Sequence, residues 1–288
     1  MSQAPADVSA RIERLFVYPV KSCAGIELRE AQLTETGFDL DRTWMVVDAQ
    51  GNCVTQRELP RMALIRPQLK LSEVVLRAPG MLALHLAIAT VEEPLRVRIW
   101  GDEVPAYDMG AVAAQWFSDF LGRPLRLVRF DPEYRRLSSP QWTQGVEALN
   151  QFSDAYPLLV ASSASLELLN TRLAAAGHAP VGIERFRPNI VLGGLEAHDE
   201  DRIDVLRIAT DGGEVQVRPV KPCARCPIPN IDPATAAVDP AVGDTLQGYR
   251  VNDRAGGAVT FAMNAIIVAG DDQLLRVGQA ASANWKFD

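Results

Sequence analysis

Residues 203–217 read Ile-Asp-Val-Leu-Arg-Ile-Ala-Thr-Asp-Gly-Gly-Glu-Val-Gln-Val, and this stretch indicates the fold class. Two apolar runs flank Asp211-Gly-Gly213, a pattern typical of two antiparallel strands joined by a tight turn. Similar short apolar runs, separated by Gly, Pro and Asp, recur along the chain at residues 15–20, 44–47, 71–76, 82–88, 95–100 and 259–268. Many short strands with turns between them predict a sandwich or a barrel.

Helical patterns interrupt these strands at two places. Residues 111–121 and 163–176 carry apolar residues at helical spacing, and each stretch ends before a Gly. Ser163 or Ser165 is expected to cap the second helix. Residues 129–145 are polar and rich in Pro and Ser, so we predict a linker or surface loop there.

The chain is therefore predicted to be a β-rich α+β protein. We expect an N-terminal β-barrel-like domain over residues 1–135 and a second β-barrel with a few helices over residues 136–288. This length of 288 residues fits one or two domains.

The composition of the chain excludes several classes of protein. Hydrophobic residues make up 48% of the chain and charged residues 23%, which excludes a mostly disordered protein. The most apolar stretch, residues 74–91, is broken by Arg, Pro, Gly and His, so it does not supply the roughly 20 apolar residues of a membrane span. A net charge of −7 argues against a dedicated nucleic-acid binder. The polar N-terminus carries no signal peptide pattern, and we expect a cytoplasmic location.

The cysteine-containing segment Arg218-Pro-Val-Lys-Pro-Cys-Ala-Arg-Cys-Pro-Ile-Pro229 is the strongest chemical signal. Lys221 and Arg225 stand next to Cys223 and Cys226, and nearby positive charge favours the thiolate form that binds metals. Four interpretations remain open: two cysteines in an ordinary loop, a redox dithiol, a zinc site, or one cysteine ligand to a metal whose other ligands come from a cofactor.

Three further motifs carry basic side chains next to predicted strands. Tyr18-Pro-Val-Lys-Ser-Cys-Ala-Gly25 offers an ammonium and a hydroxyl to a phosphate, and Asp39-Leu-Asp-Arg-Thr-Trp44 offers a guanidinium. In Arg185-Phe-Arg-Pro-Asn-Ile190, we expect an extended segment with Arg187 and Asn189 on one side. Each motif alone is also explained by an ordinary feature: an exposed turn, a surface salt bridge and an edge strand, respectively.

Together these motifs resemble the MOSC family, whose name refers to the C-terminal domain of molybdenum cofactor sulfurase, with its companion N-terminal β-barrel domain. The resemblance is greatest to the branch that contains the mitochondrial amidoxime reducing component and its bacterial relatives. It rests on five motifs in the family's order, namely Tyr18–Ser22, Asp41–Trp44, Phe152–Asp154, Arg187–Ile190 and Cys223–Cys226, the last followed by Asp232–Thr235.

The resemblance implies a site for the molybdenum cofactor in its molybdopterin form. Cys226 matches the family's molybdenum ligand and the catalytic position, whereas Cys223 is not expected to be a ligand. Other cofactor-binding positions are matched by Lys21, Ser22, Arg42, Asp154, Arg187, Asn189 and Arg225. Two departures from the mitochondrial relatives are Ala224, which replaces Ser, and Tyr156, which replaces a small polar residue.

The implied activity is the reduction of N-hydroxylated compounds: amidoximes, hydroxylamines and N-hydroxylated base analogues. No Cys follows Cys226, so we expect a separate electron-donor protein, of ferredoxin or cytochrome type with its reductase. A non-catalytic module that binds the cofactor or carries sulfur is the alternative, because MOSC domains also occur in cofactor sulfurases. We expect the cofactor between the two domains, because Lys21 and Arg42 come from one half of the chain and Arg187 and Cys226 from the other.

Overall fold

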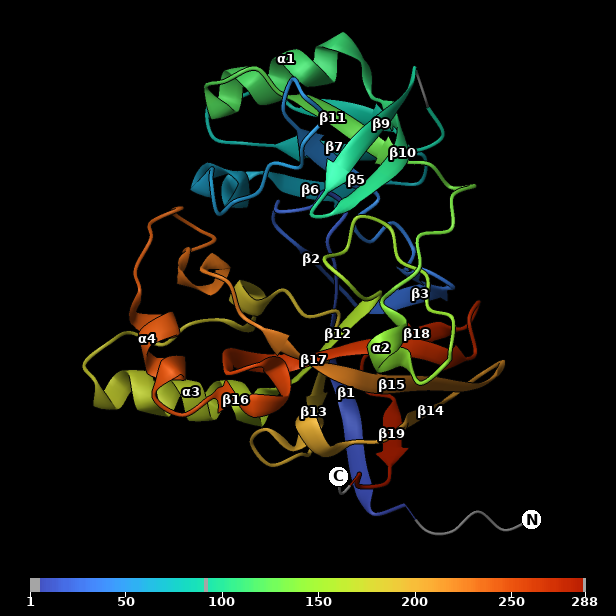
Figure 1. The fold of residues 1–288 in the computed structure, drawn as a ribbon, viewed down its shortest axis with the longest axis vertical. Coiled ribbons are helices and arrows are strands. Elements are labelled where there is room, and N and C mark those ends of the chain that lie inside the picture. The colour runs from blue at the N-terminus through green and yellow to red at the C-terminus, as the bar shows by residue number, and fades with distance from the viewer. Residues whose placement is uncertain (1–5, 91–92, 287–288) are drawn as a thin grey trace.

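The Asp211-Gly-Gly213 turn joins two paired strands, β14 (Leu206–Thr210) and β15 (Gly213–Ala224), as the sequence predicts. A computed structural model describes residues 6–90 and 93–286 of the chain. In it, β14 and β15 belong to a closed barrel of seven strands (Figure 1). The prediction of a β-rich α+β protein is confirmed.

The barrel strands follow one another around the ring in an order that differs from the chain order. Strand β12 pairs with both β13 and β17, which closes the ring. The β12–β13 pair is parallel, and the other neighbours are antiparallel. The remaining barrel strands are β12 (Leu158–Ser162), β13 (Ile190–Gly193), β1 (Val8–Val17), β19 (Ala280–Ala283) and β17 (Ala258–Ala269).

A second β-rich half lies above the barrel in Figure 1. It contains one sheet of β5 (Trp44–Val47), β11 (Arg126–Phe130), β10 (Asp102–Asp108) and β9 (Pro94–Ile99), and another of β6 (Arg66–Leu69), β7 (Glu73–Arg77) and β8 (Leu84–Ala87). Helix α1 (Gly110–Leu121) covers it and buries Trp116, Phe117 and Phe120 in its core.

The N-terminal strand lies in the barrel and not in the upper half. Strand β1 pairs with β13 and β19, both from the second half of the sequence, and β2 (Ile26–Leu28) pairs with β1. Strand β3 (Glu30–Thr34) pairs with β4 (Gly37–Phe38) and β18 (Leu274–Arg276). The chain thus begins in the barrel and then enters the upper half. The division into residues 1–135 and 136–288 stays a prediction.

Several local predictions need correction. The turn at residues 48–52 also predicts a strand over residues 53–57, but these residues form only a bridge at Cys53, because the chain turns at once into the short helix η1 (Pro60–Leu64). Helix α3 (Ser163–Ala175) is capped by Ser162, whose hydroxyl accepts from the Ser165 N–H. The predicted linker includes α2 (Pro140–Thr143). The other short elements are η2 (Ile183–Phe186), η3 (Asp199–Arg202), η4 (Ile228–Asn230), α4 (Ala241–Gln247), β16 (Val251–Asn252) and η5 (Asp253–Ala255).

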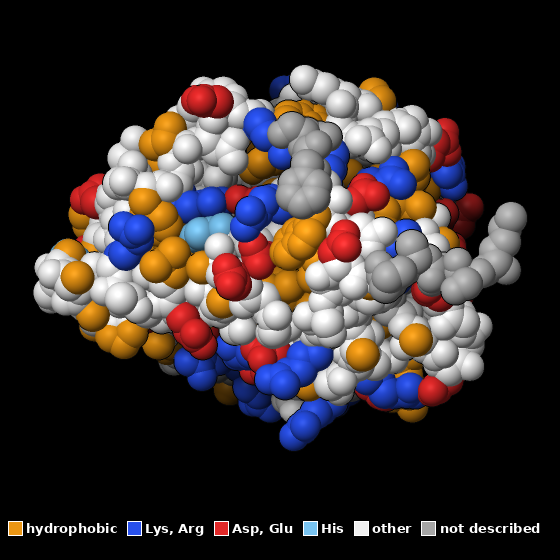
Figure 2. All heavy atoms as spheres, turned by 90° about the horizontal axis from the view of Figure 1, so that it is seen from below, with side chains coloured by type: hydrophobic (Ala, Val, Ile, Leu, Met, Phe, Trp, Pro, Cys, Tyr) orange, Lys and Arg blue, Asp and Glu red, His pale blue; other side chains and the backbone are white. Residues whose placement is uncertain are grey.

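Charge at the lower end of the barrel is mixed. On the face shown in Figure 2, basic and acidic side chains are interspersed with apolar ones. Among residues 6–90 and 93–286, no helix is long and apolar enough to cross a membrane.

A buried carboxyl group connects η3 to the start of α3. Glu200 is fully buried and accepts hydrogen bonds from the hydroxyls of Ser162 (2.9 Å) and Ser165 (2.7 Å). Burial, and then the charge of Asp201, raise the pKa of Glu200 from 4.5 to about 7. The folded protein therefore binds this proton more tightly than the unfolded chain does.

This difference predicts that Glu200 makes the folded state less stable as the pH rises from about 4.5 to 7. One pKa unit corresponds to about 1.4 kcal/mol, so ionisation of Glu200 should lower the free energy of unfolding by about 3 kcal/mol over that range. Glu200→Gln removes the group that ionises. Between pH 4 and pH 8, the free energy of unfolding of the wild type should therefore fall by about 3 kcal/mol relative to that of the variant. Urea denaturation measures the difference, with the exposed Glu196→Gln as control. A wild-type-to-variant difference that is independent of pH contradicts the prediction.

Candidate functional site

A pocket lies at the junction of the barrel and the upper half, and we call it the junction pocket. The loop after β1, the turn before β5, the segment before β12, the connection from η2 to β13 and the end of β15 all contribute to it. Every site residue predicted from the sequence lines it, namely Lys21, Ser22, Arg42, Asp154, Arg187, Asn189, Arg225 and Cys226. The fold therefore brings together motifs that are up to 205 positions apart in the chain.

Three of these residues have a left-handed backbone. The φ angles are 67° at Ser22, 52° at Arg42 and 59° at Arg187. Such conformations cost about 1–2 kcal/mol for a residue with a Cβ, and they gather at functional sites. Arg187 precedes Pro188, which disfavours a right-handed helical conformation for it. The predicted extended segment at Arg187 is therefore wrong: Arg187 ends η2, and β13 begins only at Ile190.

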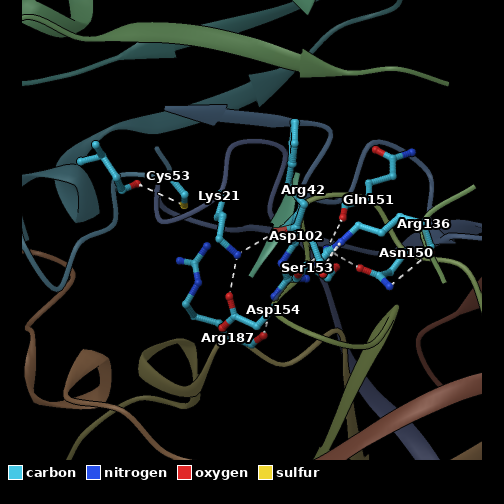
Figure 3. Close-up of polar contacts among 12 residues, drawn as sticks. Lys21, Arg42, Cys53, Asp102, Arg136, Asn150, Gln151, Ser153, Asp154 and Arg187 are labelled. Atoms are coloured by element: carbon cyan, nitrogen blue, oxygen red, sulfur yellow. Dashed lines mark hydrogen bonds and ion pairs between the residues drawn. The ribbon is translucent and has the colours of Figure 1, made fainter. Parts of the chain in front are cut away.

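Lys21 is a buried cation at the wall of the pocket. It is 5% exposed, and its Nζ donates to the Phe152 carbonyl (2.7 Å) and to Asp154 Oδ1 (2.5 Å), as Figure 3 shows. Desolvation opposes ionisation of Asp154, but Lys21, Arg42 and Arg57 outweigh it and hold the pKa of this carboxyl group below its usual range. The Asp154 side chain is 66% exposed, so solvent screens this ion pair and a stronger anion can compete for Lys21.

Arg136 positions the turn that carries Asp154. It is 7% exposed, and its Nη1 donates to Asn150 Oδ1 (2.7 Å) and to the carbonyls of Gln151 (2.7 Å) and Ser153 (2.8 Å). Its Nη2 donates to Asp102 Oδ2 (2.7 Å) in the upper half (Figure 3). The segment that the sequence marks as a linker therefore contributes a buried side chain that supports the pocket.

Arg42 and Arg187 lie against one aromatic ring. Their guanidinium carbons are 4.4 Å and 4.3 Å from the centroid of the buried Tyr18 ring. Arg42 forms an ion pair with the buried Asp41, and its Nη2 donates to the Arg187 carbonyl (3.1 Å). Arg187 Nη1 donates to the Cys23 carbonyl (2.6 Å). Among the described residues, the buried Arg187 Nη2 has no hydrogen-bond partner.

The environment of Arg187 is unfavourable for a charge. Burial, and then the neighbouring charge of Arg42, lower its pKa from 12.5 to about 10. A buried guanidinium without a carboxylate is costly unless an anion neutralises it. The site is thus suited to an anionic ligand.

Asn189 already connects three parts of the protein. Its Oδ1 accepts from Arg42 Nη1 (3.1 Å) and from the Leu159 N–H (3.1 Å), and its Nδ2 donates to the Phe16 carbonyl (3.3 Å). It is 1% exposed, so its evident role is to orient Arg42. Its predicted contact with a pterin stays a prediction.

The two cysteines of the Cys223–Cys226 motif differ in their surroundings. Cys223 Sγ is 3.0 Å from Arg225 Nη1 and packs against an apolar cluster, and Cys226 follows the end of β15. Both line the pocket, and both are free thiols. Over residues 6–90 and 93–286, no three His, Cys, Asp or Glu side chains gather in a group that could hold a metal.

The charges around the pocket do not balance within the protein. Lys21 pairs with Asp154 and Arg42 with Asp41. Three further cations line the pocket, and in the described part of the chain none has a carboxylate partner: Arg57, Arg187 and Arg225. Arg57 belongs to no sequence motif, and only the fold brings it here. The excess of about three positive charges is appropriate for a small anion with a phosphate group.

The strain at Ser22 leads to a prediction. Ser22→Gly should stabilise the cofactor-free protein by about 1 kcal/mol, because Gly adopts a positive φ without penalty. It should also weaken ligand retention, because the hydroxyl is lost. The matched control is Ser153→Gly, since Ser153 lines the same pocket with an ordinary φ and should be destabilised. Thermal denaturation of the two cofactor-free variants measures their stability. Equal losses of stability in Ser22→Gly and Ser153→Gly contradict the prediction.

Comparisons with known proteins find matches over both halves of the chain. Residues 9–124 match the MOSC N-terminal beta barrel domain, and residues 148–279 match the MOSC domain. Mitochondrial amidoxime-reducing component 1 of Mus musculus is 37% identical over 252 residues, which cover 84% of this chain and 72% of the mouse protein. The human protein of that name is 35% identical over 254 residues, with coverage of 84% and 72%. Molybdenum cofactor sulfurase of Bos taurus is 31% identical over 241 residues, which cover 78% of this chain and 27% of that protein.

Proposed function

Because the chain belongs to the family of proteins with a MOSC N-terminal domain and a MOSC domain that includes the mitochondrial amidoxime reducing components, we propose that it is a molybdenum-cofactor-dependent oxidoreductase. Its proposed substrates are N-hydroxylated compounds: amidoximes, hydroxylamines and N-hydroxylated base analogues. The observation that carries the proposal is the meeting of Cys226 with three uncompensated arginines in one pocket.

The donor set of the pocket fits this cofactor. A thiolate is a soft ligand that suits molybdenum, and the arginines suit a phosphate. The unpartnered nitrogen atoms support the fit, since Arg187 Nη2 and Arg225 Nε are buried without hydrogen-bond partners in the described part of the chain. We assign Cys226 to the metal, and Lys21, Ser22, Arg42, Asp154, Arg187, Asn189 and Arg225 to the pterin and its phosphate.

The bound cofactor would supply the two-electron redox chemistry, and the protein would supply orientation and charge. Arg187 and Arg225 neutralise the phosphate. Lys21 gives up its ion pair with the exposed Asp154 and binds a stronger anion instead. Tyr156 also lines the pocket, and its buried hydroxyl has no hydrogen-bond partner among the described residues. Burial raises the pKa of this phenol.

A separate ferredoxin-type or cytochrome-type protein, with its reductase, is our proposed electron donor. The mouse and human amidoxime-reducing components named above are mitochondrial, and a cytoplasmic location for this chain stays a prediction.

The proposal is tested by metal analysis and turnover together. Protein from a host that makes the cofactor should contain about one molybdenum per chain and should convert benzamidoxime to benzamidine when a chemical reductant supplies electrons. Metal and pterin without any turnover would instead support a cofactor-binding or sulfur-carrier module. The similarity to the bovine sulfurase favours that module as the second candidate. Absence of both metal and pterin contradicts both functions.

A further inference from the structure

The hairpin between β9 and β10 has an unusual turn. Ile99 pairs with Asp102, so the connection consists of Trp100 and Gly101 alone. Trp100 has a φ of 55°, whereas the φ of Gly101 lies outside the left-handed region. In two-residue turns with a positive φ only at the first position, that position normally belongs to Gly. Here the order is reversed, because the bulky residue occupies the strained position and Gly occupies the permissive one.

A bulky residue with positive φ is a true outlier, and such outliers persist where function requires them. A Cβ atom at position 101 would have no atom within 4 Å of it. The turn therefore also has room for Gly at position 100 and a residue with a side chain at position 101. Turn chemistry therefore does not explain Trp100.

The side chain of Trp100 extends toward the junction pocket. Its ring centroid is 4.3 Å from the Arg57 guanidinium carbon and 5.5 Å from Lys21 Nζ. Both cations line the pocket. Trp100 remains 47% exposed, so part of the residue is accessible to a ligand. Trp100 is not itself a lining residue of the pocket, but its ring contacts two of the cations that are.

The surroundings of the ring indicate the kind of ligand. The charged residues Arg98 and Asp102 beside it are exposed, so Trp100 is an isolated aromatic group and not part of the wide apolar patch that a docked protein needs. An aromatic face offers nothing to an anion, and the pocket cations already serve that purpose. A neutral, planar, conjugated molecule gains most from such a surface by stacking.

We infer that Trp100 is a specificity-determining residue on which planar, conjugated N-hydroxylated substrates stack at the entrance of the junction pocket. The inference rests on the proposed function. It predicts a preference for aromatic amidoximes over small aliphatic ones, which comes from substrate binding and not from the chemical step.

The test uses Trp100→Gly, with Trp100→Phe as the matched control. Gly removes the ring and also relieves the positive φ, so Trp100→Gly should be at least as stable as the wild type and a loss of affinity does not reflect misfolding. We expect the KM for benzamidoxime to rise about 10-fold in Trp100→Gly with a much smaller change in kcat, and by less than about 3-fold in Trp100→Phe. The KM for acetamidoxime should rise by less than about 2-fold in either variant.

Molybdenum content and a fluorescence titration separate this inference from the proposed function. Stacking should quench the Trp100 contribution, seen as the difference between wild type and Trp100→Phe on titration with benzamidoxime. If neither amidoxime is reduced, the proposed function fails and the titration still decides the role of Trp100. Three results overturn the inference: equal KM changes for the two substrates, a fall in molybdenum content in Trp100→Gly, or a change confined to the KM for the electron donor.

Discussion

Cys226→Ala should lose its molybdenum and more than about 100-fold of its turnover of benzamidoxime. Loss of groups that only support a ligand already costs about 10- to 100-fold, and loss of the protein's own metal ligand should cost more. Cys226 follows the last residue of β15 and lines the junction pocket together with the arginines that we assign to the cofactor. The measurement is metal content by mass spectrometry, with steady-state turnover on the same samples.

The matched control is Cys223→Ala, three positions away and in the same pocket. Cys223 already contacts Arg225 and packs against apolar neighbours, so its removal should mainly lower stability. We expect Cys223→Ala to keep most of its molybdenum and to lose less than about 10-fold of its turnover. Loss of metal in Cys223→Ala together with retention in Cys226→Ala would reverse the two assignments.

Arg187→Met should reduce molybdenum and pterin content by about 10-fold or more. Met has a similar length without the charge, so the variant loses the unpartnered guanidinium that we assign to the cofactor's phosphate. Because the charged form of Arg187 is disfavoured by burial and by Arg42, its removal should cost the cofactor-free protein little stability. The expected signature is a large fall in cofactor content with a nearly unchanged unfolding midpoint of the apoprotein.

Arg185→Met provides the control, because Arg185 lies on the same short helix, η2, and pairs with Asp232 (3.1 Å) outside the junction pocket. It should retain the cofactor. Equal cofactor losses in both variants would mean that η2 responds to any substitution and would contradict a specific role for Arg187.

The fold class and eight of the residues that meet in the pocket could be predicted from the sequence. Turn chemistry at Asp211-Gly-Gly213 and short apolar runs are local signals, and the structure confirms the hairpin and the β-rich architecture. Each site motif alone was ambiguous, and the order of the five motifs along the chain, which resembles the MOSC family, indicated the site residues. Their meeting in one pocket is a geometric fact, and their chemical roles stay proposals.

Only the tertiary structure decided which distant segments lie together. Strand β1 pairs with β13 and β19, and no local pattern encodes a pairing partner that is about 180 or 270 residues away. Arg57, Trp100 and Arg136 belong to no motif, and contacts with residues distant in the chain position their side chains. The left-handed backbone at Arg187 likewise follows from the surrounding packing, which holds a conformation that an isolated chain disfavours.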